Sequence, residues 1–187
     1  LADVKTLYES NSDTTLPPLE MQFDEYEIWR NHGQHHTDAA AVQFAFWQNA
    51  LASPPPALEL PVDFIKHDKE ASNCSGFGLI PIGVSDELSD RLRKFSIEHS
   101  LRLRVVLLAA FHLLLARHTG NTDVAVGCHV SERALHVELK KLVGNFENWV
   151  PVRVSSDDHP SIGTFVGRVT EALALAEANP SVKLQAL

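Results

Sequence analysis

Three histidines and one aspartate lie between residues 32 and 38, and these side chain types can bind metal ions. His32 and His36 are four residues apart, so on a helix both imidazoles would lie on one face. His35 and Asp38 complete the group. The sequence offers no second pair of ligands at a matching spacing, and histidines on a helix surface are usually solvated. We therefore predict no metal site here.

Other patterns of chemically active residues are missing from the sequence. It contains no Ser-His-Asp or Cys-His arrangement, no phosphate-binding glycine loop and no paired-cysteine zinc signature. Cys74 lies in a polar Asn-Cys-Ser stretch and Cys128 in an alternating apolar run. Two isolated cysteines do not form a disulfide framework, so we expect reduced thiols and a cytoplasmic protein.

Composition limits the function further. The 187 residues are 44% hydrophobic, enough for one domain or one lobe of a larger domain. A net charge of −8 opposes nucleic-acid binding, which needs a clustered basic surface. The longest apolar run, residues 103–116, is interrupted by Arg104 and His112, so we expect a soluble protein with a buried helix there and no membrane span. The first residues read like a chain cut inside a helix.

Periodicity predicts the elements that would position functional residues. Apolar residues at helical spacing predict helices over residues 21–31, 39–50, 85–95 and 101–117, with Gly120 ending the last of these. Residues 101–117 are apolar on all sides, which favours deep burial. A final helix should begin near Pro160 and bury Ile162, Phe165, Val169 and Leu173.

Strands are expected where apolar residues alternate. The three runs are 79–84, 124–130 and 150–154, and Pro151 would confine the last to an edge or an irregular start. A short helical piece should lie at 135–142. Helices interleaved with strands predict an α/β fold.

Four segments in a fixed order resemble the condensation domains of nonribosomal peptide synthetases. Residues 23–29 (Phe-Asp-Glu-Tyr-Glu-Ile-Trp) are similar to the family pattern Tyr-x-Asp-Tyr-Ala-Val-Trp, and residues 46–63 run from Phe-Trp to Leu-Glu-Leu-Pro-Val-Asp as in the family. Residues 107–127 are similar to the family's long helix and following strand. Residues 143–153 (Val-Gly-Asn-Phe-Glu-Asn-Trp-Val-Pro-Val-Arg) resemble Ile-Gly-x-Phe-Val-Asn-Thr-x-x-x-Arg. The specificity lies in the ordered set.

The sequence also departs from the family. The His-Gln-Asp-x-Pro-Phe-Glu-Lys-Leu segment is represented only by residues 179–184, Asn-Pro-Ser-Val-Lys-Leu. The catalytic His-His-x-x-x-Asp-Gly motif is not present, and in the family it would precede residue 1. His35 and His36 do not replace it, because Asp38 follows too early and no glycine comes after it.

The resemblance implies roles for four residues and a catalytic role for none. Gly144, Asn148 and Trp149 match a segment that borders the family's substrate channel, where an amide such as Asn148 can hydrogen-bond reacting groups. Trp149 stands where the family has a small threonine, so it would narrow the channel or pack in the core. Arg133 matches an arginine that pairs with the aspartate of the absent motif, which would leave it without that partner here. The alternative is a surface arginine balanced by neighbouring glutamates.

The resemblance also implies a fold and an activity. It predicts a lobe of the chloramphenicol-acetyltransferase-like α/β architecture with a mixed sheet covered by helices, incomplete at both ends. Residues 1–187 would be a condensation-domain fragment, in which 1–18 are a helix remnant and a proline-terminated linker and 19–187 are a segment of the second lobe. The activity would be amide formation between thioesters tethered to carrier proteins.

The expected partners are donor and acceptor carrier proteins, the first lobe and adjacent synthetase domains, with no nucleic acid and no membrane. No cofactor would bind directly, because the carriers bring the phosphopantetheine arms. Without the histidine motif the chain should be inactive alone. A cyclisation or epimerisation relative, or a non-catalytic lobe that docks carrier proteins, remains an alternative.

Overall fold

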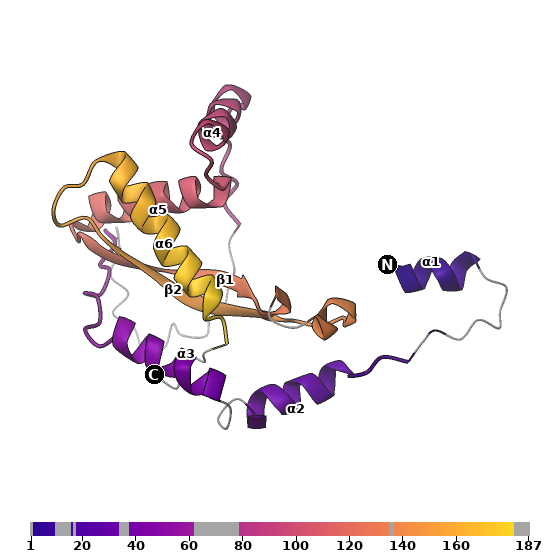
Figure 1. Cartoon of the computed structure of the whole chain (residues 1–187). Helices are drawn as coiled ribbons and strands as arrows, with labels where there is room; N and C mark the ends of the chain where they lie inside the picture. Colours follow the sequence, from indigo (N-terminus) through magenta and orange to yellow (C-terminus); the bar gives the residue numbers. More distant parts are fainter. Residues whose placement is uncertain are drawn as a thin grey trace, which may run out of the picture.

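Helices and a small sheet make up the computed structural model (Figure 1). It describes residues 2–9, 16, 18–33, 38–61, 79–134 and 137–181, without the side chains of residues 2–3, 31–33, 38–40 and 134. The helices are α1 (Ala2–Glu9), α2 (Phe23–Gly33), α3 (Asp38–Ala50), α4 (Asp86–Glu98), α5 (Leu103–Thr119) and α6 (Ile162–Ala178). The strands are β1 (Asp123–Ser131) and β2 (Glu147–Ser155), joined through the 3₁₀ turns η3 (Glu132–Ala134) and η4 (Glu138–Lys141). The α/β prediction is confirmed.

The sheet within the described residues is one antiparallel pair, β1 with β2. Its register places Val124 opposite Val154 and Cys128 opposite Val150. Side chains alternate between the two faces of a strand, so these four residues lie on the same face. Pro151 lies opposite Gly127 in a strand with no second neighbour in the described part of the chain, which agrees with the expected edge position.

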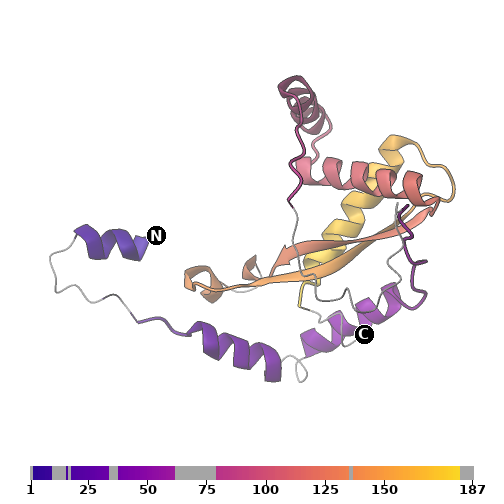
Figure 2. The ribbon, with the colours of Figure 1, turned by 180° about the vertical axis from the view of Figure 1, so that it is seen from behind.

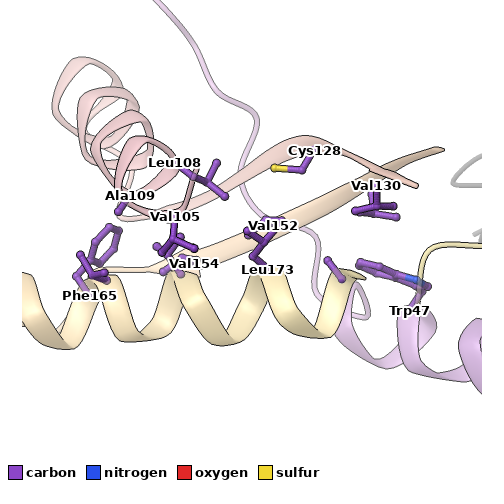
Figure 3. Close-up of a cluster of buried hydrophobic side chains, with 14 residues drawn as sticks. Trp47, Val105, Leu108, Ala109, Cys128, Val130, Val152, Val154, Phe165 and Leu173 are labelled. Atoms are coloured by element: carbon purple, nitrogen blue, oxygen red, sulfur yellow. The ribbon is translucent and has the colours of Figure 1, made fainter. Parts of the chain in front are cut away.

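That face of the sheet packs against α5 and α6 and forms the main core (Figure 3). Val150, Val152, Val169 and Leu173 are fully buried there, and Trp47 of α3 closes the end of the cluster. Burying side chains of this size stabilises the fold by about 1.5–3 kcal/mol each. Figure 2 shows the same arrangement from behind, with α1 apart from the other elements.

Helix α5 is less buried than its composition predicts. Val105, Leu108 and Ala109 face the core, but Leu107 and Phe111 are 49% and 46% exposed. The prediction of deep burial on all sides is therefore wrong, because α6 and the sheet cover only one side of α5 within the described residues. The predicted stop is confirmed: Gly120 adopts φ 75°, a left-handed conformation that favours glycine.

One polar side chain in this core joins α5 to the sheet. The imidazole of His112 is 1% exposed and lies between two carbonyl oxygens, with Nδ1 2.9 Å from Leu108 O and Nε2 3.0 Å from Val152 O. Both ring nitrogens therefore lie within hydrogen-bond distance of a backbone carbonyl, one in α5 and one in β2. Cys128 lies in the same core, where burial raises the pKa of its thiol.

The start of α6 differs from the prediction. Ser161 caps the helix, since its Oγ accepts a hydrogen bond from the Thr164 N–H at 3.2 Å, and Pro160 lies before the cap instead of in the first turn. Ile162 is 71% exposed, so its predicted burial is wrong, because the helix starts beyond the edge of the core. The predicted burial of Phe165, Val169 and Leu173 is confirmed.

Two further expectations need correction. Residues 79–84 alternate like a strand but form none, because the described residues provide no neighbour for their backbone groups; Leu79 and Ile82 are 95% and 88% exposed. The helical piece expected at 135–142 is shorter than predicted, since only the 3₁₀ turn η4 at Glu138–Lys141 forms there, and residues 135–136 lie outside the described residues. Both regions are connections between regular elements: residues 79–84 lead into α4, and η3 and η4 join β1 to β2.

Arg153 ties α3 to the sheet. Its guanidinium donates to Asp123 at 2.9 Å (Nε to Oδ1) and 2.5 Å (Nη2 to Oδ2), and Nη1 also donates to the carbonyl of Ser53 just after α3. This pairing lowers the pKa of the Asp123 carboxyl below its usual 3.8.

No single helix among the described residues is long and apolar enough to cross a membrane; α4 and α5 meet the length and composition criteria only together, as a pair bent by 112°.

Candidate functional site

The four predicted site residues come together at one end of the β1–β2 ribbon. Asn148 lies opposite Val130 in the last part of the ladder, and Trp149 lies opposite His129. The ladder continues one step further, where the Glu132 N–H donates to the Phe146 carbonyl at 2.8 Å. The loop between the two strands therefore brings Arg133 and Gly144 to the same end.

Arg133 donates three hydrogen bonds to the loop that follows it. Its Nη1 donates to the carbonyl oxygens of Leu139 at 2.6 Å and Leu142 at 2.9 Å, and Nη2 donates to that of Gly144 at 3.3 Å. The guanidinium also lies 4.2 Å from the centre of the Phe146 ring, within cation–π range. The expected aspartate partner belongs to the motif that this sequence lacks, and three of the five guanidinium N–H groups of Arg133 donate to loop carbonyls instead. Neighbouring glutamates do not balance it either, since the described ion pairs of Glu132 run to α2.

Asn148 points to the helix-covered face of the sheet. Its Nδ2 donates to the Pro180 carbonyl just after α6 at 2.7 Å, and its Oδ1 accepts from the Trp149 N–H at 3.0 Å. The side chain is half-buried. An amide in this position can orient a hydrogen-bonding partner, and it also fastens the end of α6 to β2.

Trp149 points to the opposite face. It is 55% exposed, and its ring meets His129 edge-on, with ring centres 3.7 Å apart. The Nδ1 of His129 in turn lies 2.9 Å from Oε2 of Glu147. Because neighbouring side chains on a strand alternate, Asn148 and Trp149 do not share one face of the ribbon. The two residues lie at the same end of the ribbon but point to opposite sides of it.

Gly144 makes a close approach to α2. A Cβ at this position would overlap the Phe23 ring, so any other residue would displace it. Phe23 also packs edge-on against Phe146 with ring centres 5.3 Å apart. Tight packing accounts for the glycine here, whatever it also contributes to a channel.

The sequence analysis missed a buried polar group next to Arg133. Glu132 is 2% exposed, and its Oε2 accepts a hydrogen bond from the Tyr26 hydroxyl and lies 3.6 Å from Nε of Arg30. Burial and the Glu132 carboxylate both raise the pKa of Tyr26 above its usual range. Tyr26 looked like an ordinary core aromatic in the sequence. Nothing in the spacing of residues 26 and 132 could have revealed the contact.

A pocket of about 280 Å³ lies beside this group, between the residues before α2 and the η4 turn. Its lining residues are Pro18, Leu19, Glu20, Met21, Val137, Glu138, Lys141 and Leu142. None of the four predicted site residues lines it.

The histidine cluster of the sequence cannot be placed. His35 and His36 lie outside the described residues, as do Cys74 and residues 182–184, and the side chains of His32 and Asp38 are not described. Among the side chains that are described, no three of the His, Cys, Asp or Glu type gather as a metal site would require.

The four candidate residues can bind and orient but cannot move protons near neutral pH. Guanidinium, amide and indole groups do not titrate there, and glycine has no side chain. Their arrangement is therefore suited to shaping a wall and offering hydrogen bonds.

Comparison with known proteins agrees with the resemblance. A family model described as a condensation domain matches residues 1–187. Gramicidin S synthase 2 of Brevibacillus brevis is 28% identical over 178 residues, which are 95% of this chain and 4% of that protein. The chain thus spans a small part of the curated relatives that it matches.

Solved structures share the fold. The X-domain in complex with OxyB from teicoplanin biosynthesis superposes with a TM-score of 0.70 at 24% identity, over 91% of this chain and 38% of that one. The first condensation domain of the CDA synthetase gives 0.69 at 17% identity, over 92% and 37%. The predicted α/β fold is confirmed, but the sheet in the described part of the chain is antiparallel and not mixed as expected.

Proposed function

Because the chain belongs to the condensation-domain family, we propose that it forms part of the second lobe of a condensation domain in a nonribosomal peptide synthetase. The amine of a carrier-bound acceptor attacks the thioester carbonyl of a carrier-bound donor. The C–N bond forms, the C–S bond breaks, and the departing thiolate takes up the proton that the amine loses. The observation that carries the proposal is the match of the family model to all 187 residues.

Within this reaction the chain supplies positioning. The ribbon end presents the half-buried amide of Asn148 and the exposed indole of Trp149, and neither can accept a proton from an amine at neutral pH. Residues 1–187 contain no His-His-x-x-x-Asp-Gly motif. By itself the chain is therefore inactive.

The proposed partners follow from the reaction. Donor and acceptor carrier proteins deliver their substrates on phosphopantetheine arms, and the chain binds no cofactor of its own. A first lobe and adjacent synthetase domains complete the assembly in the cytoplasm.

Peptide transfer between two loaded carrier proteins tests the proposal. The intact synthetase polypeptide should produce acceptor-bound amide, detected by mass spectrometry of the carrier, whereas residues 1–187 alone should not. Transfer by the chain alone would contradict the positioning role. Failure of the intact polypeptide with every donor and acceptor pair tried would contradict the reaction itself.

Asn148→Ala in the intact polypeptide tests the amide. We expect transfer to slow by about tenfold, since an orienting hydrogen bond contributes to positioning more than to binding. Asn145→Ala is the matched control, because that asparagine is exposed in the loop just before β2. Unchanged kinetics in Asn148→Ala would reduce Asn148 to a structural residue that fastens Pro180 to β2.

A second candidate is a non-catalytic lobe that docks carrier proteins. It is favoured by Arg133, whose hydrogen bonds to three loop carbonyls give it a structural role that needs no catalytic aspartate. Under this function the intact polypeptide binds carrier proteins but transfers nothing, and substitution of Asn148 leaves carrier affinity unchanged.

A further inference from the structure

A carboxylate is buried where the β1–β2 ribbon meets α2. Glu132 is 2% exposed and Tyr26 is 1% exposed, and the Tyr26 hydroxyl donates to Oε2 of Glu132. Nε of Arg30 lies 3.6 Å from the same oxygen, and 15% of the Arg30 side chain is exposed. We call Tyr26, Arg30 and Glu132 the Glu132 anchor.

Packing alone does not explain this group. Removing a carboxylate from water costs several kcal/mol unless its oxygens are well paired. Here Oε1 of Glu132 and Nε of Arg30 are both buried without a hydrogen-bond partner among the described residues. Apolar side chains of similar volume would fill the space at lower cost. The anchor is therefore better explained by what it fixes in place than by stability.

Glu132 is placed to fix Arg133. Its backbone N–H donates to the Phe146 carbonyl at 2.8 Å, so the residue is held at both ends, by β2 through the backbone and by α2 through the side chain. The next residue is Arg133, whose guanidinium lies 4.2 Å from the Phe146 ring centre. The Tyr26 ring packs on the same phenylalanine, with ring centres 4.9 Å apart.

Arg133 in turn shapes the loop that leads into the candidate site. Its three hydrogen bonds gather the carbonyls of Leu139, Leu142 and Gly144. Asn148 follows four residues after Gly144 and pairs with Val130 in the ladder, one rung inside the terminal pair of Ser131 and Glu147. If the Arg133 side chain turned away, these hydrogen bonds would break. The loop would then no longer hold the start of β2, and with it Asn148, in place.

We propose that Glu132 is a positioning residue for the condensation reaction: Tyr26 and Arg30 hold its buried carboxylate, and this fixes Arg133 and, through the 139–146 loop, the amide of Asn148. The proposal rests on the proposed function for its effect on the reaction. It extends that function to α2, which supplies no group to the candidate site itself.

The first test uses substitutions that keep the volume. Tyr26→Phe removes only the hydroxyl, and Glu132→Gln removes only the charge. In ¹⁵N-resolved NMR spectra of the 187-residue chain, we expect both to move the Arg133 Nε–H resonance and to raise its hydrogen-exchange rate severalfold. The Asn148 side-chain amide should move as well. Tyr8→Phe and Glu138→Gln are the matched controls, because both residues are exposed and lie outside the anchor.

The second test separates positioning from stability. The triple variant Tyr26→Phe, Arg30→Met, Glu132→Leu replaces the whole anchor by apolar groups, so its Tm should be no lower than that of the unsubstituted chain. Its Arg133 resonance should nevertheless show the fast exchange of the single variants. In the intact synthetase the variants should lower kcat about tenfold and change KM less than twofold, as expected when the aligned geometry is lost.

The outcomes are distinguishable. An Arg133 resonance that stays unchanged in Tyr26→Phe and in the triple variant would overturn the positioning role, whatever the activity. If Glu132→Gln does not fold, Tyr26→Phe still decides the question. Moved Arg133 signals with unchanged kcat would overturn the link to the reaction. Absence of transfer by the unsubstituted polypeptide would overturn the proposed function alone, since the NMR readout does not depend on it.

Discussion

The β1–β2 ribbon is stabilised by different interactions at its two ends, by apolar packing at one and by buried polar contacts at the other. Under α5 and α6, aliphatic side chains such as Val152 and Leu173 are completely buried and pack in one continuous cluster. At the α2 end, a smaller cluster of Tyr26, Leu139, Leu142 and Phe146 surrounds the polar Glu132 anchor. The first region gives stability at low cost. The second buries less apolar surface and is held by directional polar contacts. Such contacts suit a region that must hold particular side chains in a fixed orientation.

Leu173→Ala should have the largest effect on stability. The side chain is fully buried between α6 and the sheet, so truncation leaves a cavity and should cost about 2–5 kcal/mol of unfolding free energy. Leu175→Ala on the same helix is the control, since Leu175 is 45% exposed and should cost less than about 1 kcal/mol. Urea unfolding monitored by circular dichroism measures both. Equal losses would mean that the main core does not lie where the structure places it.

Gly144→Ala should have the next largest effect, and it probes the α2 end. The new methyl group would overlap the Phe23 ring, at a cost of about 1–3 kcal/mol from overpacking. Phe23→Leu in the same molecule should restore part of the loss, because it removes the obstructing ring. A double-mutant cycle from urea unfolding gives the coupling energy. Additive losses would show that the two residues are not in contact.

Asp123→Asn should show a smaller, pH-dependent loss at the α3 tie. The Arg153 hydrogen bonds lower the folded-state pKa of Asp123 below 3.8, so the ionised form is favoured in the fold. This stabilisation is complete above the usual aspartate pKa and disappears as the pH falls through the lower folded-state value. We expect wild type to exceed the variant by about 1 kcal/mol near pH 7, with the gap closing only below about pH 4.

The more exposed pair of Asp158 and Arg168 provides the control for this titration. Arg168 also lowers the pKa of Asp158, but water screens the pair, so Asp158→Asn should change stability less than Asp123→Asn. Urea midpoints in steps from neutral to acidic pH measure both variants. A gap for Asp123→Asn that persists at the lowest pH would assign its effect to lost packing instead of charge.

Trp149→Ala should have the smallest effect on stability. The indole is 55% exposed, so its removal should cost about 0.5 kcal/mol or less in urea unfolding. If Trp149 narrows a substrate channel, as the sequence resemblance implies, peptide transfer by the intact synthetase should instead change its preference toward bulkier substrates. A large stability loss would show that Trp149 packs like a core residue.

The sequence alone determined most of the fold. Apolar spacing located α2 to α6, and alternation located β1 and β2, because burial of one face imposes a period of 3.6 or 2 on the residues. The sequence-based prediction failed where an element forms or becomes buried only if another segment packs beside it. Residues 79–84 alternate without pairing, and α5 is apolar all round but covered on one side.

The candidate site divides in the same way. Its residues could be found from the ordered segments, and the strand register gathers them at one end of the ribbon. Their contacts could not. The partners of Arg133 are backbone carbonyls, which every sequence has, and the Glu132 anchor joins residues 106 positions apart. Local spacing governs which face of an element is apolar, whereas the meeting of a tyrosine hydroxyl with a distant carboxylate depends on how the elements pack, and only the tertiary structure decided that.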